Sequence, residues 1–183
     1  VLSVGATPVL VDVVDTLTLD PAAVKAAITP KTKAIMPVHM CGSMADLDAL
    51  MAICKEHDLL LLEDACQSTG ATYKGRALGS IGHAGTFSFD FVKTITCAEG
   101  GAVITNSEDV YTKCDAYSDH GHDHLGGADR GADGHPYLGY NFRISELHAA
   151  VGLAQIRKLD KFLAILRNNK EVLKNTLAEV PGI

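Results

Sequence analysis

Residues 58–65, with the sequence DLLLLEDA, constrain the fold more than any other part of the chain. Four consecutive leucines lead into two acidic residues, Glu63 and Asp64. An apolar run of this kind is typical of a central strand in a parallel sheet, because such a strand is buried on both faces. Ligands of open α/β sheets bind outside the carboxyl ends of the strands. The segment therefore predicts an interior parallel strand whose polar end is a candidate binding site.

Strand-like and helix-like segments alternate along the rest of the chain. Apolar, β-branched runs predict further strands at residues 9–13, 33–39, 85–90 and 101–106. Asp20 and Pro21 suit the N-cap and first turn of a helix, and Leu47, Leu50 and Cys54 recur at helical spacing. This alternation predicts an α/β fold, a three-layer α/β/α domain with a mainly parallel sheet.

The end of the chain has a helical pattern of about thirty residues that starts at Ser145. We expect residues 1–145 to form a large domain and residues 146–183 a long helix leading towards a further domain. The sequence begins with Val1 rather than Met, so it reads as a piece of a longer protein. The apolar positions expected to form a buried stripe are Leu159, Phe162, Leu163, Leu166, Leu173, Leu177 and Val180.

Composition excludes several classes of function. The chain has 16 basic and 22 acidic residues, a formal net charge of -6, and no basic cluster, which argues against nucleic-acid binding. No apolar run approaches the ~20 residues that cross a bilayer. The five cysteines are scattered singly, so no disulfide framework is expected and a reducing cytoplasm is the natural location.

Two glycine- and histidine-containing segments carry weaker signals. GSIGHAG at 79–85 does not space its glycines as a dinucleotide-binding or P-loop motif does. His120, His122 and His124 alternate as metal ligands can, but no second cluster of ligands is evident, so no metal is expected. The surrounding segment, 118–140, reads as a long loop that either contacts a substrate or is solvated.

Four side chains at or just past the predicted strand ends are candidates for chemistry: Asp64, Gln67, Ser88 and Lys93. Each has a structural alternative. A lysine is usually a solvated charge, and Asp64 could cap a turn or a helix, with Glu63 easily mistaken for it. Ser88 could be a core serine bonded to the backbone, and Gln67 a loop residue.

Four short motifs in a fixed order place these residues in context: EDA-x-Q at 63–67, SF-xxx-K at 88–93, EGG at 99–101 and GYNFR at 139–143. Together they resemble the DegT/DnrJ/EryC1/StrS family of sugar aminotransferases, and the resemblance covers essentially the whole chain. It implies the large domain of fold type I, which binds pyridoxal 5'-phosphate (PLP). The N-terminal segment and the small C-terminal domain of the family are missing from this stretch.

The resemblance also implies a role for each candidate. Lys93 would hold PLP as a Schiff base, Asp64 would pair with the pyridine nitrogen, and Gln67 would lie near the ring hydroxyl. Ser88 would bind the phosphate. Asn141 would reach the phosphate of the neighbouring subunit, which implies a homodimer; alternatively it caps the following helix. A carboxylate suits the pyridine nitrogen because it keeps that nitrogen protonated, so the ring can take up electrons.

The reaction implied is transfer of an amino group from an amino acid, L-glutamate in the family, to a keto sugar that is nucleotide-linked or acidic. Arg130 is a candidate partner for a sugar carboxylate. His39 would approach the cofactor pocket, and Arg143 would form a structural ion pair. Two alternatives stay open: the dehydratase branch of the family, which has a histidine where Lys93 stands, and a regulatory homologue that binds without turnover.

Overall fold

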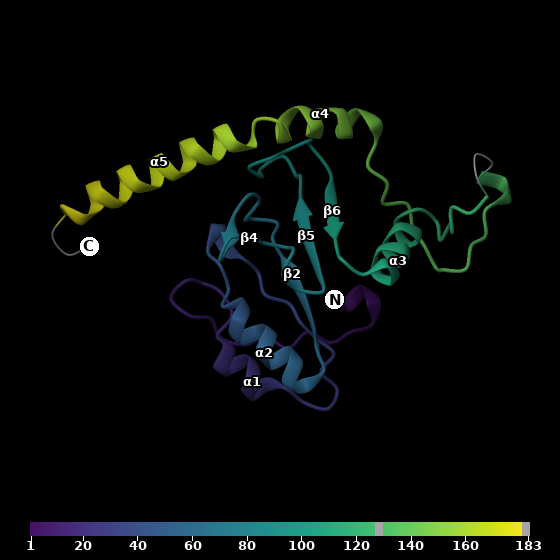
Figure 1. Cartoon of the computed structure of the whole chain (residues 1–183), viewed down its shortest axis with the longest axis horizontal. Helices are drawn as coiled ribbons and strands as arrows, with labels where there is room; N and C mark the ends of the chain where they lie inside the picture. The colour runs from purple at the N-terminus through teal and green to yellow at the C-terminus, as the bar shows by residue number, and fades with distance from the viewer. Residues whose placement is uncertain (127–129, 181–183) are drawn as a thin grey trace.

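The structure is a computed structural model that describes residues 1–126 and 130–180, with only the backbone of Arg130 included. Its main sheet has the strand order β1-β2-β5-β6 (Figure 1). The strands are β1 (Ala34–Ile35), β2 (Leu60–Asp64), β5 (Ala84–Ser88) and β6 (Gly101–Ile104). β1, β2 and β5 run parallel, and β6 is antiparallel to β5. This confirms the predicted α/β class with a mainly parallel sheet, and it places the DLLLLEDA strand in the interior.

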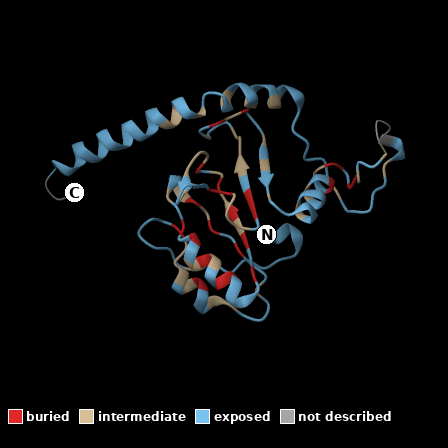
Figure 2. Ribbon diagram, in the orientation of Figure 1, coloured by how far each residue is buried: buried red, intermediate tan, exposed pale blue. Residues whose placement is uncertain are grey.

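Two helices cover one face of this sheet. α2 (Leu47–His57) packs on β1 and β2, and α1 (Pro21–Ala27) packs on α2. The predicted N-cap of α1 is confirmed, since Asp20 accepts a hydrogen bond from Ala22 N, and α2 begins at a second cap, Asp46, which accepts one from Ala49 N. The buried residues lie along β2 and between these helices (Figure 2), where Leu50 and Leu61 are fully buried. Burial of this apolar surface is the main stabilising contribution to the fold.

The remaining elements are short or lie outside this core. They are η1 (Leu2–Val4), η2 (Met40–Gly42), the antiparallel pair β3 (Thr72–Tyr73) and β4 (Arg76–Ala77), α3 (Glu108–Ser118), η3 (Arg130–Ala132), α4 (Glu146–Ile156) and α5 (Leu159–Ala178). None of the helices in the described ranges is both long and apolar enough to cross a membrane.

The strand expected at residues 9–13 is not formed. Val13 makes only an isolated antiparallel bridge to Leu19, and Leu10 is 92% exposed. A strand needs a neighbour that satisfies its backbone N–H and C=O groups. The backbone hydrogen bonds around this segment are local instead, with Asp12 O accepting from Asp20 N at 3.1 Å and Val14 N donating to Thr18 O at 2.9 Å.

The C-terminal helical pattern forms two helices rather than one, with Arg157 and Lys158 between α4 and α5. The expected buried stripe of α5 is also wrong, because none of its residues is buried. Leu159, Phe162 and Leu163 are half-buried, whereas the later positions of the stripe are exposed (Figure 2). The periodicity correctly predicted an amphipathic helix, but its apolar side is only half-buried near the start of α5 and exposed beyond it. The division at residue 145 stays a prediction.

Candidate active site

Two of the predicted site residues come together because their strands are neighbours. Asp64 is the last residue of β2, and Ser88 is the last residue of β5. The two strands are parallel, with Asp64 opposite Thr86 in the register. The carboxyl ends of parallel strands meet at one edge of the sheet, so the carboxylate and the hydroxyl lie at the same edge, as predicted.

Asp64 is held firmly by its backbone. Its N–H donates to Pro37 O at 2.9 Å, and its carbonyl oxygen accepts from His39 N at 3.0 Å. Its half-buried carboxylate accepts a hydrogen bond from Cys66 N at 3.1 Å. The strand end and the turn after it therefore fix the direction in which this carboxylate points.

Lys93 lies in the loop of residues 89–100 that connects β5 to β6. The loop is closed at its base, because Phe89 N donates to Gly100 O at 2.8 Å and Cys97 N donates to Phe89 O at 2.9 Å. Ile95 and Cys97 anchor it, each 1% exposed. Lys93 itself is half-buried, and its N–H donates to Asp90 O at 3.0 Å. The sequence alone did not show these hydrogen bonds and buried side chains, which fix the position of the loop.

The thiol of Cys66 connects Lys93 with Asp64. Burial raises the pKa of Cys66, and a hydrogen bond with the Asp64 carboxylate and its charge raise it further. A hydrogen bond with Thr86 and the positive charge of Lys93 act in the opposite direction. The pKa of the Cys66 thiol therefore responds to both the Asp64 carboxylate and the charge of Lys93.

Gln67 and Ser88 have local partners in this structure. Gln67 is exposed, and its Oε1 accepts from Cys41 N at 3.0 Å. The Ser88 hydroxyl oxygen accepts from Asp90 N at 3.3 Å, which leaves its proton available to an acceptor such as a phosphate oxygen. Both residues lie just beyond the strand ends, and their predicted contacts with a cofactor stay predictions.

Asn141 lies elsewhere in the chain. It is exposed and forms an isolated antiparallel bridge with Asp119, directly after α3. α3 lies beside β6, on the side away from β2 (Figure 1). Arg143 forms the expected ion pair, with its Nη1 against Asp119 Oδ1. The predicted role of Asn141 in a neighbouring subunit stays a prediction.

The histidine-rich loop forms pairwise contacts. The rings of His122 and His135 have centroids 4.1 Å apart, and His122 Nδ1 lies 3.4 Å from Asp133 Oδ2. In the described ranges, no group of three or more His, Cys, Asp or Glu residues could hold a metal ion. The side chain of Arg130, the candidate partner for a sugar carboxylate, lies outside the described part.

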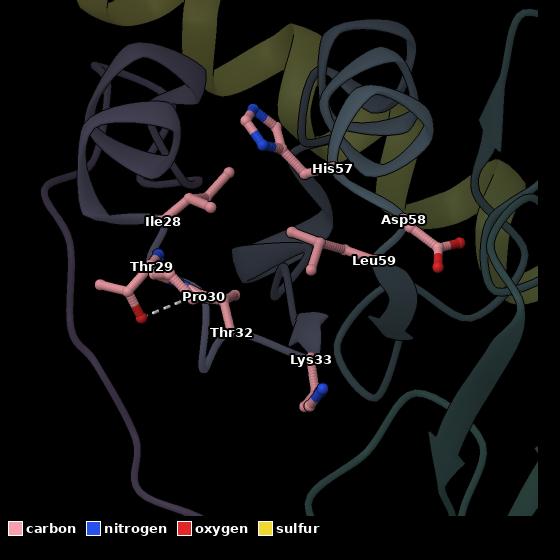
Figure 3. A pocket seen from close by; sticks show the side chains of 8 residues that line it. All are labelled: Ile28, Thr29, Pro30, Thr32, Lys33, His57, Asp58 and Leu59. Carbon is pink, nitrogen blue, oxygen red and sulfur yellow. Dashed lines mark hydrogen bonds between the residues drawn. The ribbon is translucent and has the colours of Figure 1, made fainter.

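A surface hollow of about 450 Å³ opens at the opposite edge of the sheet (Figure 3). Thr29 and Lys33, which precede β1, line it together with His57, Asp58 and Leu59, which precede β2. These residues lie at the amino ends of the strands, whereas Asp64 ends β2. The hollow is therefore separate from the candidate site.

Two buried residues, His39 and Glu63, lie next to Asp64: the sequence suggested only that His39 would approach the pocket, and it gave Glu63 no role. His39 and Glu63 are 0% and 1% exposed, and His39 Nε2 lies 3.1 Å from Glu63 Oε2. The signal was available, because a carboxylate in an apolar strand must have partners to be buried. The sequence did not show which partners these were.

The fold is similar to that of a known aminotransferase. The X-ray structure of the aminotransferase from Psychrobacter cryohalolentis superposes with a TM-score of 0.82 at 39% identity, over 87% of this chain and 42% of that one. The family described as the DegT/DnrJ/EryC1/StrS aminotransferase family matches residues 1–183, and the chain belongs to it. The predicted family and fold class are thereby confirmed.

Two similar relatives are named as a synthase and an aminotransferase. GDP-perosamine synthase of Caulobacter vibrioides is 44% identical over 87% of this chain and 42% of its own length. L-glutamine:2-deoxy-scyllo-inosose aminotransferase of Streptoalloteichus tenebrarius is 43% identical over 98% of this chain and 44% of its own length. The chain thus spans less than half the length of these relatives.

A branch with different chemistry is also similar. A crystal structure of GDP-4-keto-6-deoxymannose-3-dehydratase with a trapped PLP-glutamate geminal diamine is 31% identical. It superposes with a TM-score of 0.83 over 91% of this chain and 46% of that one. The same fold therefore accommodates PLP and glutamate in that enzyme.

Proposed function

We propose that the protein containing this chain is a PLP-dependent aminotransferase that moves an amino group from an amino acid to a keto sugar. The observation that carries the proposal is that Asp64 ends β2 and that Ser88 and the loop with Lys93 follow the parallel neighbouring strand β5, at the same edge of the sheet. A buried strand end, a carboxylate and an anchored lysine are the parts that a PLP site requires from its protein.

The donor set at this edge fits PLP. Lys93 would bind the cofactor covalently and, once released, would carry a proton to and from the substrate carbon. Asp64 would hold the proton of the pyridine nitrogen, and the Ser88 hydroxyl would donate to the phosphate. Gln67 would lie near the ring hydroxyl. PLP itself supplies the electron sink for that proton transfer.

The names of the relatives narrow the substrates. We propose L-glutamate or L-glutamine as the amino donor, in line with the aminotransferase of Streptoalloteichus tenebrarius. The acceptor would be a keto sugar, nucleotide-linked as the name GDP-perosamine synthase suggests for that relative. The amino sugar would then serve polysaccharide or other amino-sugar biosynthesis in the cytoplasm.

We also propose a homodimer in which each site is completed by the other subunit. Asn141 supports this, because it is exposed and pairs with Asp119, the residue directly after α3. Its amide is therefore available to a second copy of the chain.

A single assay separates this function from its rivals. The full-length protein is incubated with PLP, amine-labelled glutamate or glutamine, and a panel of nucleotide-linked keto sugars. Appearance of the label in the sugar supports the aminotransferase. Loss of a sugar hydroxyl without gain of the label would identify a dehydratase, and binding of PLP without any product would identify a non-catalytic homologue.

A further inference from the structure

Glu63 is a carboxylate inside the core, on the opposite face of β2 from Asp64. Successive side chains of a strand point to opposite faces, so Glu63 shares its face with the fully buried Leu61 and Asp64 shares the other with Leu62. Glu63 is 1% exposed. A charge placed there needs several donors to replace the water it has lost.

The donors come from two separate segments. Glu63 Oε1 accepts from the N–H groups of Ile81 and Gly82, both at 2.6 Å. Its Oε2 accepts from Gly79 N at 2.8 Å and lies 3.1 Å from His39 Nε2. The backbone of the glycine-rich segment 79–85, which fits no nucleotide-binding motif, therefore surrounds the carboxylate of Glu63.

Glycine is required in this segment for steric reasons. Gly79 has a φ of +85°, a conformation that other residues rarely adopt. A β-carbon on Gly82 would come within 2.6 Å of the carbonyl oxygen of Leu61. The backbone can thus approach Glu63 closely enough to donate three N–H groups.

His39 links the hydrogen-bonded carboxylate of Glu63 to the candidate site. Its Nδ1 accepts from Ala45 N at 3.3 Å, so the ring hydrogen is on Nε2 and is donated to Glu63. Its backbone N–H donates to Asp64 O at 3.0 Å, and its carbonyl oxygen accepts from Ser68 Oγ at 2.6 Å. The ring of His39 therefore bonds to Glu63 on the core side of β2, while its backbone bonds to Asp64, the proposed pyridine partner.

His39 also stabilises the turn that contains Gln67. Ser68, which bonds to the His39 carbonyl, directly follows Gln67, and Gln67 Oε1 accepts from Cys41 N. Cys41 lies two residues after His39. Asp64 and the turn that contains Gln67 are thus both hydrogen-bonded to the backbone of His39, whose buried ring is held by Glu63 and Ala45 N.

A buried hydrogen-bonded charge stabilises a fold little compared with apolar residues of the same shape, but it fixes geometry. We propose that His39 and Glu63 form a positioning pair that sets the orientation of Asp64 and Gln67 towards PLP. Neither residue touches the cofactor, and the proposal rests on the cofactor site proposed above. The reaction would therefore depend on two residues that lie on the core side of β2, outside the cofactor site.

The test measures the bound cofactor rather than turnover alone. The full-length protein is loaded with PLP, and its visible absorbance is titrated with pH in wild type, His39→Asn, His39→Gln and Glu63→Gln. A poorly held Asp64 leaves less positive charge on the ring nitrogen. The Schiff base nitrogen then holds its proton more strongly, because a nearby positive charge disfavours protonation.

We expect the titration midpoint of Glu63→Gln and His39→Asn to move to higher pH, with kcat about fivefold to tenfold lower, as for one lost hydrogen bond. KM for the amino donor should change much less. His39→Gln, which can still donate to Glu63, should stay closer to wild type. If Glu63→Gln or His39→Asn does not fold, Ser68→Ala is measured instead. We expect a smaller shift of its titration midpoint, also to higher pH.

Asp64→Asn distinguishes the two possible failures. If Asp64→Asn does not shift the midpoint, the proposed cofactor site is wrong. If Asp64→Asn shifts the midpoint but the variants of His39, Glu63 and Ser68 leave it at the wild-type value, the positioning pair is refuted while the proposed function stands.

Discussion

The backbone of Gly85 lies directly against that of Gly79, so that a β-carbon added at position 85 would overlap the Gly79 carbonyl oxygen. Gly85 belongs to β5, the strand that leads to Ser88 and Lys93. Gly79 belongs to the segment that surrounds the carboxylate of Glu63. This contact joins the candidate site to the buried carboxylate behind it.

Gly85→Ala should therefore destabilise the protein. The overlap is with backbone atoms, which cannot rotate away, and overpacking of this kind costs about 1–3 kcal/mol or more. Gly152→Ala is the matched control, because the nearest atom to its new β-carbon would be Cys97 Cβ at 3.5 Å, an ordinary contact. Within α4, that change should be neutral or stabilising by up to about 1 kcal/mol. Urea unfolding of both variants checks the difference, and equal effects would contradict the contact.

Asp64→Asn should lower kcat while PLP stays bound to Lys93. A hydrogen bond to a charged group contributes about 1.5–3 kcal/mol, which corresponds to a loss of about 10- to 150-fold in rate. Asp58→Asn is a suitable control, because Asp58 precedes β2 at the opposite edge of the sheet and has a φ of +53° that asparagine tolerates. Steady-state kinetics of both variants provide the measurement. Equal losses in the two would show that Asp64 has no special part in the reaction.

Much of this architecture followed from the sequence. The run of leucines before Glu63 and Asp64 predicted an interior strand and the position of the site, because burial and strand direction are local consequences of the pattern. The terminal helices show where the prediction failed. Leu166 and Leu173 have the spacing of a buried face, but spacing does not show whether a partner is present. In the same way, the apolar residues 9–13 had strand character without a neighbouring strand.

The site could be predicted only in part for a similar reason. Asp64 and Ser88 end neighbouring parallel strands, so the sheet places them at one edge, and Lys93 follows in the loop after β5. The partners of Glu63 come from backbone groups 16 to 19 residues away, and only the folded chain brings those groups to the carboxylate. Every residue except proline has a backbone N–H group, so the sequence does not show which of these groups donate to Glu63. Only the glycines, which let the backbone come close to the carboxylate, indicate where they are.

The pH dependence of stability should reveal Glu63. Burial raises the pKa of this carboxyl, but the bonds from His39 and from the N–H groups of Gly82, Gly79 and Ile81 lower it more, to below its ordinary value of 4.5. A carboxyl with a lowered pKa stabilises the fold above its unfolded pKa, and this contribution is lost as the pH falls through the folded pKa. Glu63→Gln should therefore lose stability at neutral pH, and its difference from wild type should shrink below pH 4.5.

Glu56→Gln is the control for that experiment. The pKa of Glu56 is also lowered, chiefly by its hydrogen bond with Lys25, but the pair is on the surface. Glu56→Gln should lower the free energy of unfolding only slightly, and this loss should vanish in high salt. The loss of unfolding free energy in Glu63→Gln should persist in high salt. Unfolding in urea at several pH values and two salt concentrations checks both. A salt-sensitive effect of Glu63→Gln would contradict its burial.

Subunit complementation tests the proposed dimer. Lys93→Ala and Asn141→Ala should each be nearly inactive alone. If Asn141 completes the site of the other subunit, a mixed dimer has one site with both residues intact, and activity should rise after the two variants are mixed and reassembled. The same activity before and after mixing would place both residues in one subunit's site.

The most direct test of the central claim is covalent labelling of Lys93. The full-length protein is purified with PLP, reduced with borohydride, digested and analysed by mass spectrometry. The account predicts a yellow protein that loses its visible absorbance on reduction and carries the pyridoxyl group on Lys93. A colourless protein, or a pyridoxyl group on any other lysine, would contradict it.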